Sequence, residues 1–363
     1  MIPIARPELP DFASYRRLLE EIWQSRMLSN FASHAQALEA EAKGYLGAAH
    51  VRAVANGDTG LVLALAALDL PEGGECLLPS FTFNSSPNAV LWNRLLPVFC
   101  EIDPESFALD PADVERRIGS RTVAILGTHV FGNPCDADRL REIAAAQNIP
   151  LLFDAAHAYG STYRGRKVGT LGDLEVFSLS GTKPVTSAEG GLVASRRAEL
   201  AERIVFGRNY GFYGDYNSRC AGLNGKISEL HAALGCLTLA TVEEVVRRRN
   251  AIAARYRENL KDVPGLSFQK IDPRDRSTFK DFAIVCARGS HGLDKHLEAC
   301  GIQTKRYFLP AHRMDYFRRF ARGPLEHTEA LYEKILCLPI YNDLILAEVD
   351  RISQAVADFF RSR

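Results

Sequence analysis

The sequence of 363 residues predicts an α/β protein in which a mostly parallel central sheet is flanked by helices, followed by a smaller α+β unit. Seven short apolar runs alternate with helix-length segments from Val51 to about Val193, as is typical of buried parallel strands joined by crossover helices. Near Pro264 the pattern changes to shorter, mixed elements. We therefore expect a large domain over residues 1–260 and a small C-terminal domain over residues 261–363.

The individual elements follow from the spacing of apolar residues. Helical spacing covers residues 11–48. The strand-like runs are HVRAVA, ECLLPS, LLPVFCEID, TVAILGTHVFG, IPLLFDAA, LEVFSLS and GGLVAS. A long helical stretch is expected from about 226 to 260, then a strand near 279–286, a helix near 290–300 and a final helix after Leu344. Ligands of such sheets bind at the carboxyl ends of the strands, so the residues that follow each run are the candidates for a site.

Composition excludes several classes of protein. The net charge is zero and the pI is near 7.1, which argues against binding to nucleic acid or to a charged membrane surface. The sequence lacks an apolar run of about 18 residues, which a membrane span requires, and its N-terminus lacks the apolar core of a signal peptide. The eight cysteines form no CxxC pair and mostly lie in apolar runs, which predicts reduced thiols, a cytoplasmic protein and no metal site.

Two charged residues follow apolar runs at the predicted ligand edge. Asp154 ends the run LLFD, where a helix cap or a turn is the commoner role and a buried carboxylate that holds a cation is the alternative. Lys183 lies among serine, threonine and glycine after the run LEVFSLS, which makes it a candidate for forming a Schiff base. If the two strands are parallel, both side chains emerge at the same edge of the sheet.

A possible anion site and an apolar wall accompany these two residues. The segment GDTG, residues 57–60, begins a strongly apolar helix whose free N–H groups suit a phosphate, although simple capping by Asn56 or Asp58 explains it equally well. Phe81 and Phe83 follow another strand, where they either belong to the core or cover a flat ring. Pyridoxal 5′-phosphate needs a lysine, a carboxylate, an anion site and a flat wall, so we predict this cofactor.

Beyond these single features, the order and spacing of nine segments resemble the DegT/DnrJ/EryC1/StrS family of sugar aminotransferases. These segments are ANGDTGL, PSFTFNSSPNAV, PVFCEIDPESFALD, GTHVFGNPCDAD, FDAAHAYGSTYRGRKVGTLGD, FSLSGTKPVTSAEGG, GLNGKISELHAALG, GIQTKRYFLPAH and CLPIYNDL. The resemblance implies the aspartate aminotransferase-like fold (fold type I) and transfer of an amino group from an amino acid, expected to be L-glutamate, to a keto-sugar nucleotide.

The resemblance also implies a role for each residue of the site. It predicts that Lys183 forms the covalent link to the cofactor, that Asp154 pairs with the pyridine nitrogen and that Phe83 stacks on the ring. Asn224 is expected to reach the phosphate of the neighbouring subunit's cofactor, so that the site is shared across a homodimer. The full set of implied cofactor contacts is Gly57, Asp58, Thr59, Phe83, Asp154, His157, Ser178, Lys183 and Asn224.

The chain departs from the usual pattern of the family at three positions. His157 stands where the family often has glutamine near the cofactor's phenolic oxygen, and its charge is open near neutral pH. Asp58 stands where threonine is common, and Lys226 where arginine is common. Lys183 itself argues against the subset of the family that has histidine there and acts as sugar 3-dehydratases.

The substrate is predicted from one segment. Residues 208–235 look most like those of members that aminate C4 of a dTDP-4-keto-6-deoxyhexose, whereas C3-aminating and GDP-sugar members share the same cofactor residues. Candidate substrate contacts are Lys280, Lys305, Arg306, Tyr307 and His312, for which solvated charges or packing are the simpler interpretation. The rival classes are another fold-type-I enzyme, such as a desulfurase, and a regulatory protein that binds the cofactor without turnover.

Overall fold

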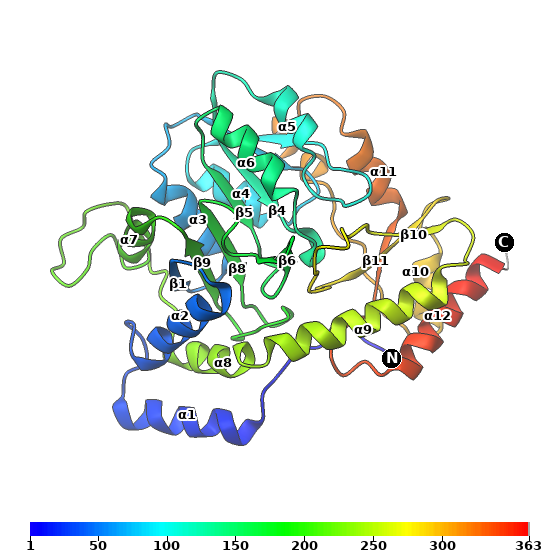
Figure 1. The fold of residues 1–363 in the computed structure, drawn as a ribbon, viewed down its shortest axis with the longest axis horizontal. Coiled ribbons are helices and arrows are strands. Elements are labelled where there is room, and N and C mark those ends of the chain that lie inside the picture. Colours follow the sequence, from blue (N-terminus) through cyan, green and yellow to red (C-terminus); the bar gives the residue numbers. More distant parts are fainter. Residues whose placement is uncertain (362–363) are drawn as a thin grey trace.

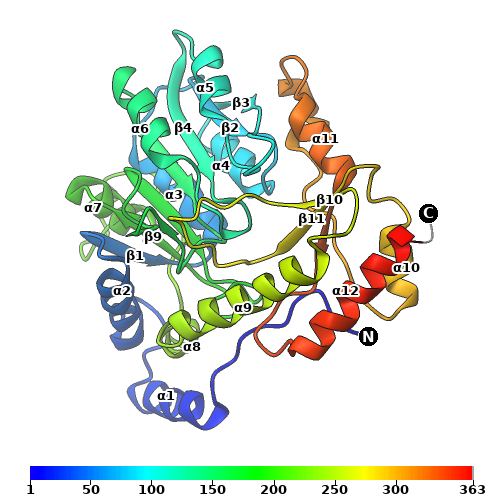
Figure 2. The same ribbon diagram turned by 45° about the vertical axis from the view of Figure 1, so that its right-hand side comes forward.

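The computed structural model describes residues 1–361, and its centre is a seven-stranded sheet with helices on both faces (Figures 1 and 2). The strand order is β1-β9-β8-β5-β4-β2-β3. These strands are β1 (His50–Val54), β2 (Glu75–Pro79), β3 (Leu96–Cys100), β4 (Thr122–Thr128), β5 (Leu151–Asp154), β8 (Leu174–Ser178) and β9 (Gly191–Ser195). All seven predicted strands are confirmed.

One strand runs against the predicted direction. β2, β3, β4, β5 and β8 pair in parallel, but β9 is antiparallel to both β1 and β8. The chain passes from β8 to β9 through a loop with no crossover helix, and a parallel connection needs such a crossover. The sheet is therefore mostly parallel, as predicted, with β9 as the exception.

Two layers of helices sandwich this sheet. The helices of the protein are α1 (Phe12–Ser25), α2 (Ser33–Leu46), α3 (Gly57–Ala67), α4 (Ser85–Trp92), α5 (Pro111–Arg117), α6 (Ala137–Ala146), α7 (Ala198–Gly207), α8 (Glu229–Leu239), α9 (Val242–Leu260), α10 (Leu293–Ala299), α11 (Glu326–Lys334) and α12 (Leu346–Arg361). Core residues of α2, α5, α6 and α8 pack on one face of the sheet and those of α3, α4 and α7 on the other. Neighbouring strand residues such as Leu152 and Phe153 enter opposite cores, which explains why the strands read as continuous apolar runs.

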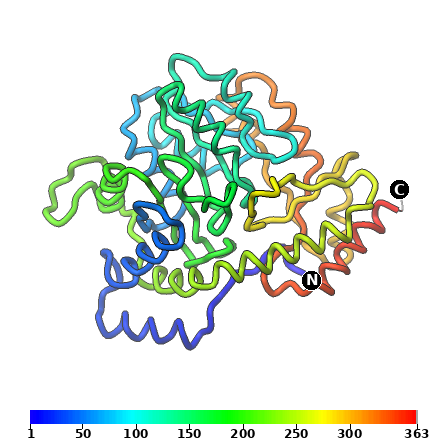
Figure 3. Tube along the Cα trace, in the orientation of Figure 1, coloured from blue at the N-terminus to red at the C-terminus, as the bar shows by residue number. Residues whose placement is uncertain are grey.

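A second, antiparallel sheet forms the C-terminal part of the protein. It consists of β10 (Leu266–Phe268), β11 (Phe282–Cys286) and β12 (Ile335–Leu338), with α10 and α12 packed against it. The predicted strand near 279–286, helix near 290–300 and final helix correspond to β11, α10 and α12, whereas the short β10 and β12 gave no signal. The N-terminus lies beside this sheet, where Ile2 bridges to Ile302 (Figure 3).

Helix α9 connects the two parts of the chain. Val242 and Val246 at its start belong to the core of the large sheet, and Tyr256 and Leu260 at its end belong to that of the small sheet. A domain division at residue 260 therefore stays a prediction, because one continuous helix serves both cores. Among the helices of residues 1–361, none combines the length and apolar character needed to cross a bilayer.

A buried carboxylate anchors the strand that leads into the predicted site. Glu175 on β8 is 1% exposed and accepts hydrogen bonds from the backbone N–H groups of Gly169, Leu171 and Gly172. Burial raises the pKa of Glu175 to about 6. The loop before β8 thus folds around a single side chain of the strand.

We expect Glu175→Gln to lower the free energy of unfolding by about 1–3 kcal/mol, because an amide NH₂ would face N–H donors that lose their acceptor. Chemical denaturation at pH 7 measures this change. Glu202→Gln, which alters an exposed carboxylate on α7, is the control and should change stability by less than about 0.5 kcal/mol. Equal stability of the two variants would contradict the anchoring role.

Candidate active site

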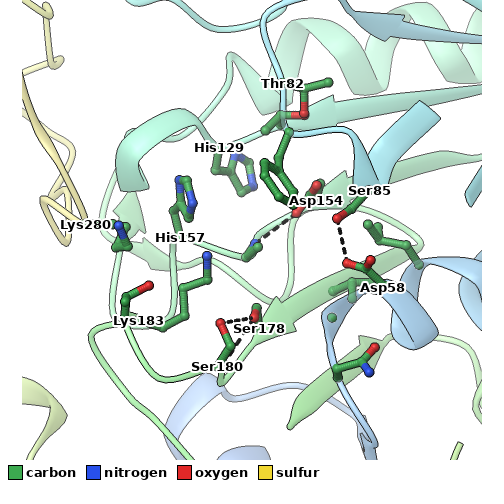
Figure 4. A pocket seen from close by; sticks show the side chains of 18 of the residues that line it. Asp58, Thr82, Ser85, His129, Asp154, His157, Ser178, Ser180, Lys183 and Lys280 are labelled. Carbon is green, nitrogen blue, oxygen red and sulfur yellow. Dashed lines mark hydrogen bonds between the residues drawn. The ribbon is translucent and has the colours of Figure 1, made fainter. Parts of the chain in front are cut away.

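A cavity of about 410 Å³ lies at the carboxyl edge of the large sheet, where ten of the predicted site residues meet (Figure 4). The ten are Gly57, Asp58, Phe83, Asp154, His157, Ser178, Lys183, Lys280, Lys305 and Tyr307. They come from the ends of β5 and β8 and the loops that follow them, the start of α3, the segment between β2 and α4, and loops of the small sheet. The parallel pairing of β5 with β8 brings Asp154 to the same edge as the loop after β8 that carries Lys183, as the sequence predicted.

Asp154 is a buried carboxylate, 4% exposed, at the end of β5. Ser86 Oγ donates to its Oδ2 at 2.7 Å, and the N–H of Ala156 donates to its Oδ1 at 3.1 Å. Thr82 Oγ1 lies 3.0 Å from Ser86 Oγ and 3.0 Å from Thr128 Oγ1, so a chain of hydroxyls supports the carboxylate. Burial raises the pKa of Asp154, which means that its charged form favours a cationic partner in the cavity.

Lys183 lies in the loop between β8 and β9, with its side chain turned into the cavity. Its N–H donates to the carbonyl of Ser180 at 2.9 Å, which fixes the turn that carries it. Burial, assisted by the nearby charge of Lys280, lowers the pKa of Lys183 to about 8. At this pKa roughly a tenth of its amine is uncharged at pH 7, far more than for an ordinary lysine, and nucleophilic chemistry requires this form.

His157 is held neutral beside these two residues. The N–H of Phe131 donates to its Nδ1 at 3.3 Å, so the neutral ring carries its proton on Nε2. Burial, reinforced by the charges of Lys183 and Lys280, holds the pKa of His157 well below its usual value. The ring is thus a hydrogen-bond donor to the cavity, as the glutamine of related sequences would be.

His129, at the end of β4, is a site residue that sequence reasoning missed. Its Nδ1 accepts the N–H of Cys135 at 3.0 Å, which places the proton on Nε2, and burial lowers its pKa to about 3. His129 lines the cavity, and its Nε2 is buried and donates to no acceptor within residues 1–361. An unpaired buried donor of this kind is costly unless a ligand supplies the acceptor. Its position directly after a strand was the available signal.

The start of α3 is capped by Asn56 and leaves two N–H groups free at the cavity, where the sequence predicted an anion site. Asn56 Oδ1 accepts the N–H of Thr59 at 2.8 Å, so Asn56 is the cap, and the N–H groups of Gly57 and Asp58 have no carbonyl within the helix to bond. A Cβ on Gly57 would lie 3.0 Å from Cβ of Ser178, so only glycine fits there without displacing the serine. Asp58 Oδ1 accepts a 2.6 Å hydrogen bond from Ser85 Oγ, which turns its charge toward α4.

Phe83 forms an open part of the wall, since 56% of its surface is exposed. Its ring lies 6.3 Å from that of Phe308, and both residues line the cavity.

Four of the predicted residues lie outside the cavity wall. Thr59 borders a neighbouring hollow, and Asn224 is exposed with its backbone bridged to Asn209. Arg306 donates to Ser290 Oγ at 2.9 Å, and His312 is held between Ser80 and Glu329.

A lysine amine, a buried carboxylate and a helix start that converge at the carboxyl edge of a mostly parallel sheet are typical of fold-type-I aminotransferases that use pyridoxal 5′-phosphate. The chain belongs to the DegT/DnrJ/EryC1/StrS aminotransferase family, whose sequence pattern matches residues 13–357. It is a pyridoxal 5′-phosphate-dependent nucleotide-sugar aminotransferase. The predicted family, fold class, enzyme class and cofactor are confirmed.

Individual relatives differ in the nucleotide that their names specify. The chain is 31% identical over 352 residues to the dTDP-4-amino-4,6-dideoxy-D-glucose transaminase of Escherichia coli, covering 94% of each protein. It is 32% identical over 367 residues to the GDP-perosamine synthase of Caulobacter vibrioides, covering 98% of this chain and 97% of that protein. The crystal structure of DesI in the presence of its TDP-sugar product superposes with a TM-score of 0.94 at 35% identity, covering 99% of this chain and 93% of DesI.

We expect Ser86→Ala to weaken the binding of pyridoxal 5′-phosphate about 5- to 10-fold, because the ionised Asp154 carboxylate loses one donor worth about 1–1.5 kcal/mol. Titration of the apo protein with the cofactor, followed by absorbance, measures the dissociation constant. The neighbouring Ser85→Ala, which removes the hydrogen bond to Asp58, is the matched control and should have the smaller effect. The opposite order of effects would contradict the support of Asp154 by Ser86.

Proposed function

We propose that the enzyme transfers the amino group of L-glutamate to C4 of a dTDP-4-keto-6-deoxyhexose, giving a dTDP-4-amino-4,6-dideoxyhexose. The observation that carries the proposal is the convergence of Lys183 and Asp154 on one cavity. The resemblance of residues 208–235 to C4-aminating members, and the dTDP- and TDP-linked names among the relatives, support this choice of sugar. The alternatives are amination of a GDP-linked sugar and amination at C3. Of these two, the similarity to GDP-perosamine synthases favours the GDP-linked sugar.

Each residue of the cavity has a defined task in this proposal. When bound, the cofactor supplies an electron sink for the bond that breaks at Cα of the amino donor. Lys183 binds the cofactor through Nζ and, when released, moves the proton from Cα of the donor as a general base. Asp154 would hold a proton on the ring nitrogen of the bound cofactor, and His157 would donate from Nε2 to its phenolic oxygen. The free N–H groups of Gly57 and Asp58, together with Ser178, would receive the phosphate, whereas the N–H of Thr59 is already bonded to Asn56.

Lys305 and Tyr307 are the proposed contacts for the nucleotide's diphosphate at the mouth of the cavity. Lys305 is exposed, and its ammonium lies 4.4 Å from the centre of the Tyr307 ring. A cation in this position can approach a phosphate without first being desolvated. Arg306 and His312 face other protein groups, so the proposal makes no use of them.

We also infer a homodimer in which Asn224 serves the partner's site, and a cytoplasmic location in keeping with eight unpaired cysteines. The segment between α7 and α8 extends away from the body (Figures 1 and 3). It carries exposed aromatic side chains, with 61% of Tyr213 and 87% of Tyr216 accessible. Such side chains are typical of protein interfaces.

Lys183→Ala should abolish turnover, because the only proposed base is removed, while the cofactor still binds noncovalently. The covalent link is tested in the wild-type protein by borohydride reduction and peptide mapping, which should place the pyridoxyl tag on Lys183. A tag on another lysine, or wild-type turnover by Lys183→Ala, would refute the assignment.

The sugar is tested with the enzyme in its pyridoxamine form. Offered dTDP- and GDP-linked 3-keto- and 4-keto-sugars, it should recover absorbance near 410–430 nm fastest with the dTDP-4-keto-6-deoxyhexose. Fastest recovery with a GDP-linked or 3-keto-sugar would select the alternative. If glutamate converts the enzyme to its pyridoxamine form but none of these sugars restores the absorbance, the proposed class of acceptor is wrong.

The shared site is tested by mixing two inactive variants, Lys183→Ala and Asn224→Ala. In a mixed dimer one site combines the intact Lys183 of one subunit with the intact Asn224 of the other. Activity should therefore reappear in one of the two sites of each mixed dimer. Mixtures that stay as inactive as the separate variants, although mixed dimers form, would contradict a contribution of Asn224 to the partner's site.

A further inference from the structure

The lysine at position 280 is unusual because it is almost completely buried in the wall of the active-site cavity. Lys280 is 3% exposed and lies two residues before Phe282, the first residue of β11. Lysine side chains are rarely buried unless a partner neutralises their charge. The sequence alone favoured a solvated surface charge at this position, so its burial is a new observation.

The partner is the next residue in the chain. Nζ of Lys280 lies 2.9 Å from Oδ1 and 3.1 Å from Oδ2 of Asp281, which is also 3% exposed. Removing both charges from water costs free energy that the attraction between them often fails to recover, so apolar residues would serve stability at least as well. A buried pair in a cavity wall therefore suggests a use for its charge.

The backbone around this pair is held from two sides. The N–H of Lys280 donates to the carbonyl of Phe131 at 2.9 Å, and the buried Arg249 donates from Nη1 to the carbonyl of Phe279 at 3.1 Å. Phe131 also supplies the N–H that fixes His157. The charged pair is thus anchored to the same loop that orients a neighbouring residue of the site.

The pair is oriented with its positive end toward Lys183. Lys280 lines the cavity, whereas Asp281 is not among its lining residues. Figure 4 shows the side chains of Lys280 and Lys183 on the same side of the cavity, next to His157. The other titratable or charged groups of the cavity wall are Asp58, His129, Asp154, His157, Glu189, Lys305 and Tyr307.

The balance of these groups leaves Lys280 as the cation with the greatest influence on Lys183. Asp281, Asp154 and Asp58 act in the opposite direction and favour the charged form of Lys183, Asp281 most strongly of the three, and burial holds His157 neutral. Lys305 is exposed, so solvent screens its charge. After burial, the charge of Lys280 is the largest cause that lowers the pKa of Lys183.

We propose that Lys280 is a positioning residue, held by Asp281, that presents a fixed positive charge to Lys183 and shifts the Lys183 amine toward its uncharged, reactive form. A neighbouring cation activates a lysine nucleophile in this way because two ammonium groups repel each other in a cavity shielded from water. The inference rests on the proposed role of Lys183 and adds the residue that prepares it.

Competitive labelling of the apo protein tests this role without any turnover. Trace acetic anhydride is added between pH 6 and 11, and mass spectrometry of the Lys183 peptide gives the pH at which half of its maximal reactivity is reached. In the wild-type protein this midpoint should lie near 8. Lys280→Met should raise it by about one pH unit or more, because the repelling cation is lost.

Three further variants separate the charge of Lys280 from its packing. Lys280→Arg retains the cation and should keep the wild-type midpoint. Lys280→Met combined with Asp281→Asn removes the whole pair and should raise the midpoint less than Lys280→Met alone, which leaves Asp281 unpaired. Lys305→Met, the matched exposed lysine of the same cavity, should leave the midpoint unchanged.

Two results would overturn the proposal. In the first, the labelling midpoint of Lys183 stays at its wild-type value in both Lys280→Met and the double variant. In the second, the midpoint rises equally in Lys280→Arg and Lys280→Met, which would indicate that packing matters and charge does not. If Lys280→Met fails to fold, the double variant and Lys280→Arg decide the question. Borohydride mapping reports separately on Lys183, so failure of its proposed role is distinguishable from failure of the role of Lys280.

Discussion

The buried carboxylate of Asp154 is the constraint on which the site depends. A charged group removed from water at the end of a strand is stable only if donors and a cation surround it. The hydroxyl of Ser86 and the N–H of Ala156 supply two hydrogen bonds, and the remaining demand is for a positive partner in the cavity. In the proposed function, a protonated ring nitrogen of the bound cofactor would meet that demand.

The sequence was most informative where local pattern and burial agree. Strands covered on both faces read as apolar runs, and the polar residue that ends each run is conspicuous, which is why Asp154 and Lys183 could be predicted. The direction of β9 depends on whether a crossover helix intervenes, which the apolar run itself does not encode. His129 was missed because a single polar residue after a strand looks like an ordinary loop residue until its partners are known. Ser86 was missed because it lies in the first turn of α4, where serine is common. Lys280 looked solvated because its partner is adjacent in sequence, where opposite charges commonly lie on a surface.

The small sheet completes the cavity because a separate apolar cluster joins it to the large part. Phe81 and Phe131 from the large part form one cluster with Phe308 and Cys337 from the C-terminal part. The rings of Phe81 and Phe308 lie 5.3 Å apart in an edge-to-face arrangement. The loops that carry Lys280 and Tyr307 therefore hold a fixed position relative to Lys183, although about a hundred residues separate them in the chain.

One further cluster shows why geometry must be combined with access. Ser80 Oγ lies 2.6 Å from Nδ1 of His312, whose Nε2 lies 3.0 Å from Glu329, an arrangement similar to a hydrolase triad. Ser80 is completely buried and is absent from the cavity wall, so no substrate carbonyl can reach its hydroxyl. The N–H of His312 donates to the same Ser80 Oγ at 3.1 Å, and the N–H of Ala311 donates to the carbonyl of Ser80 at 2.9 Å. These contacts tie the loop that carries Phe308 to the end of β2, just before Phe83, so the triad-like cluster serves to hold two walls of the cavity together.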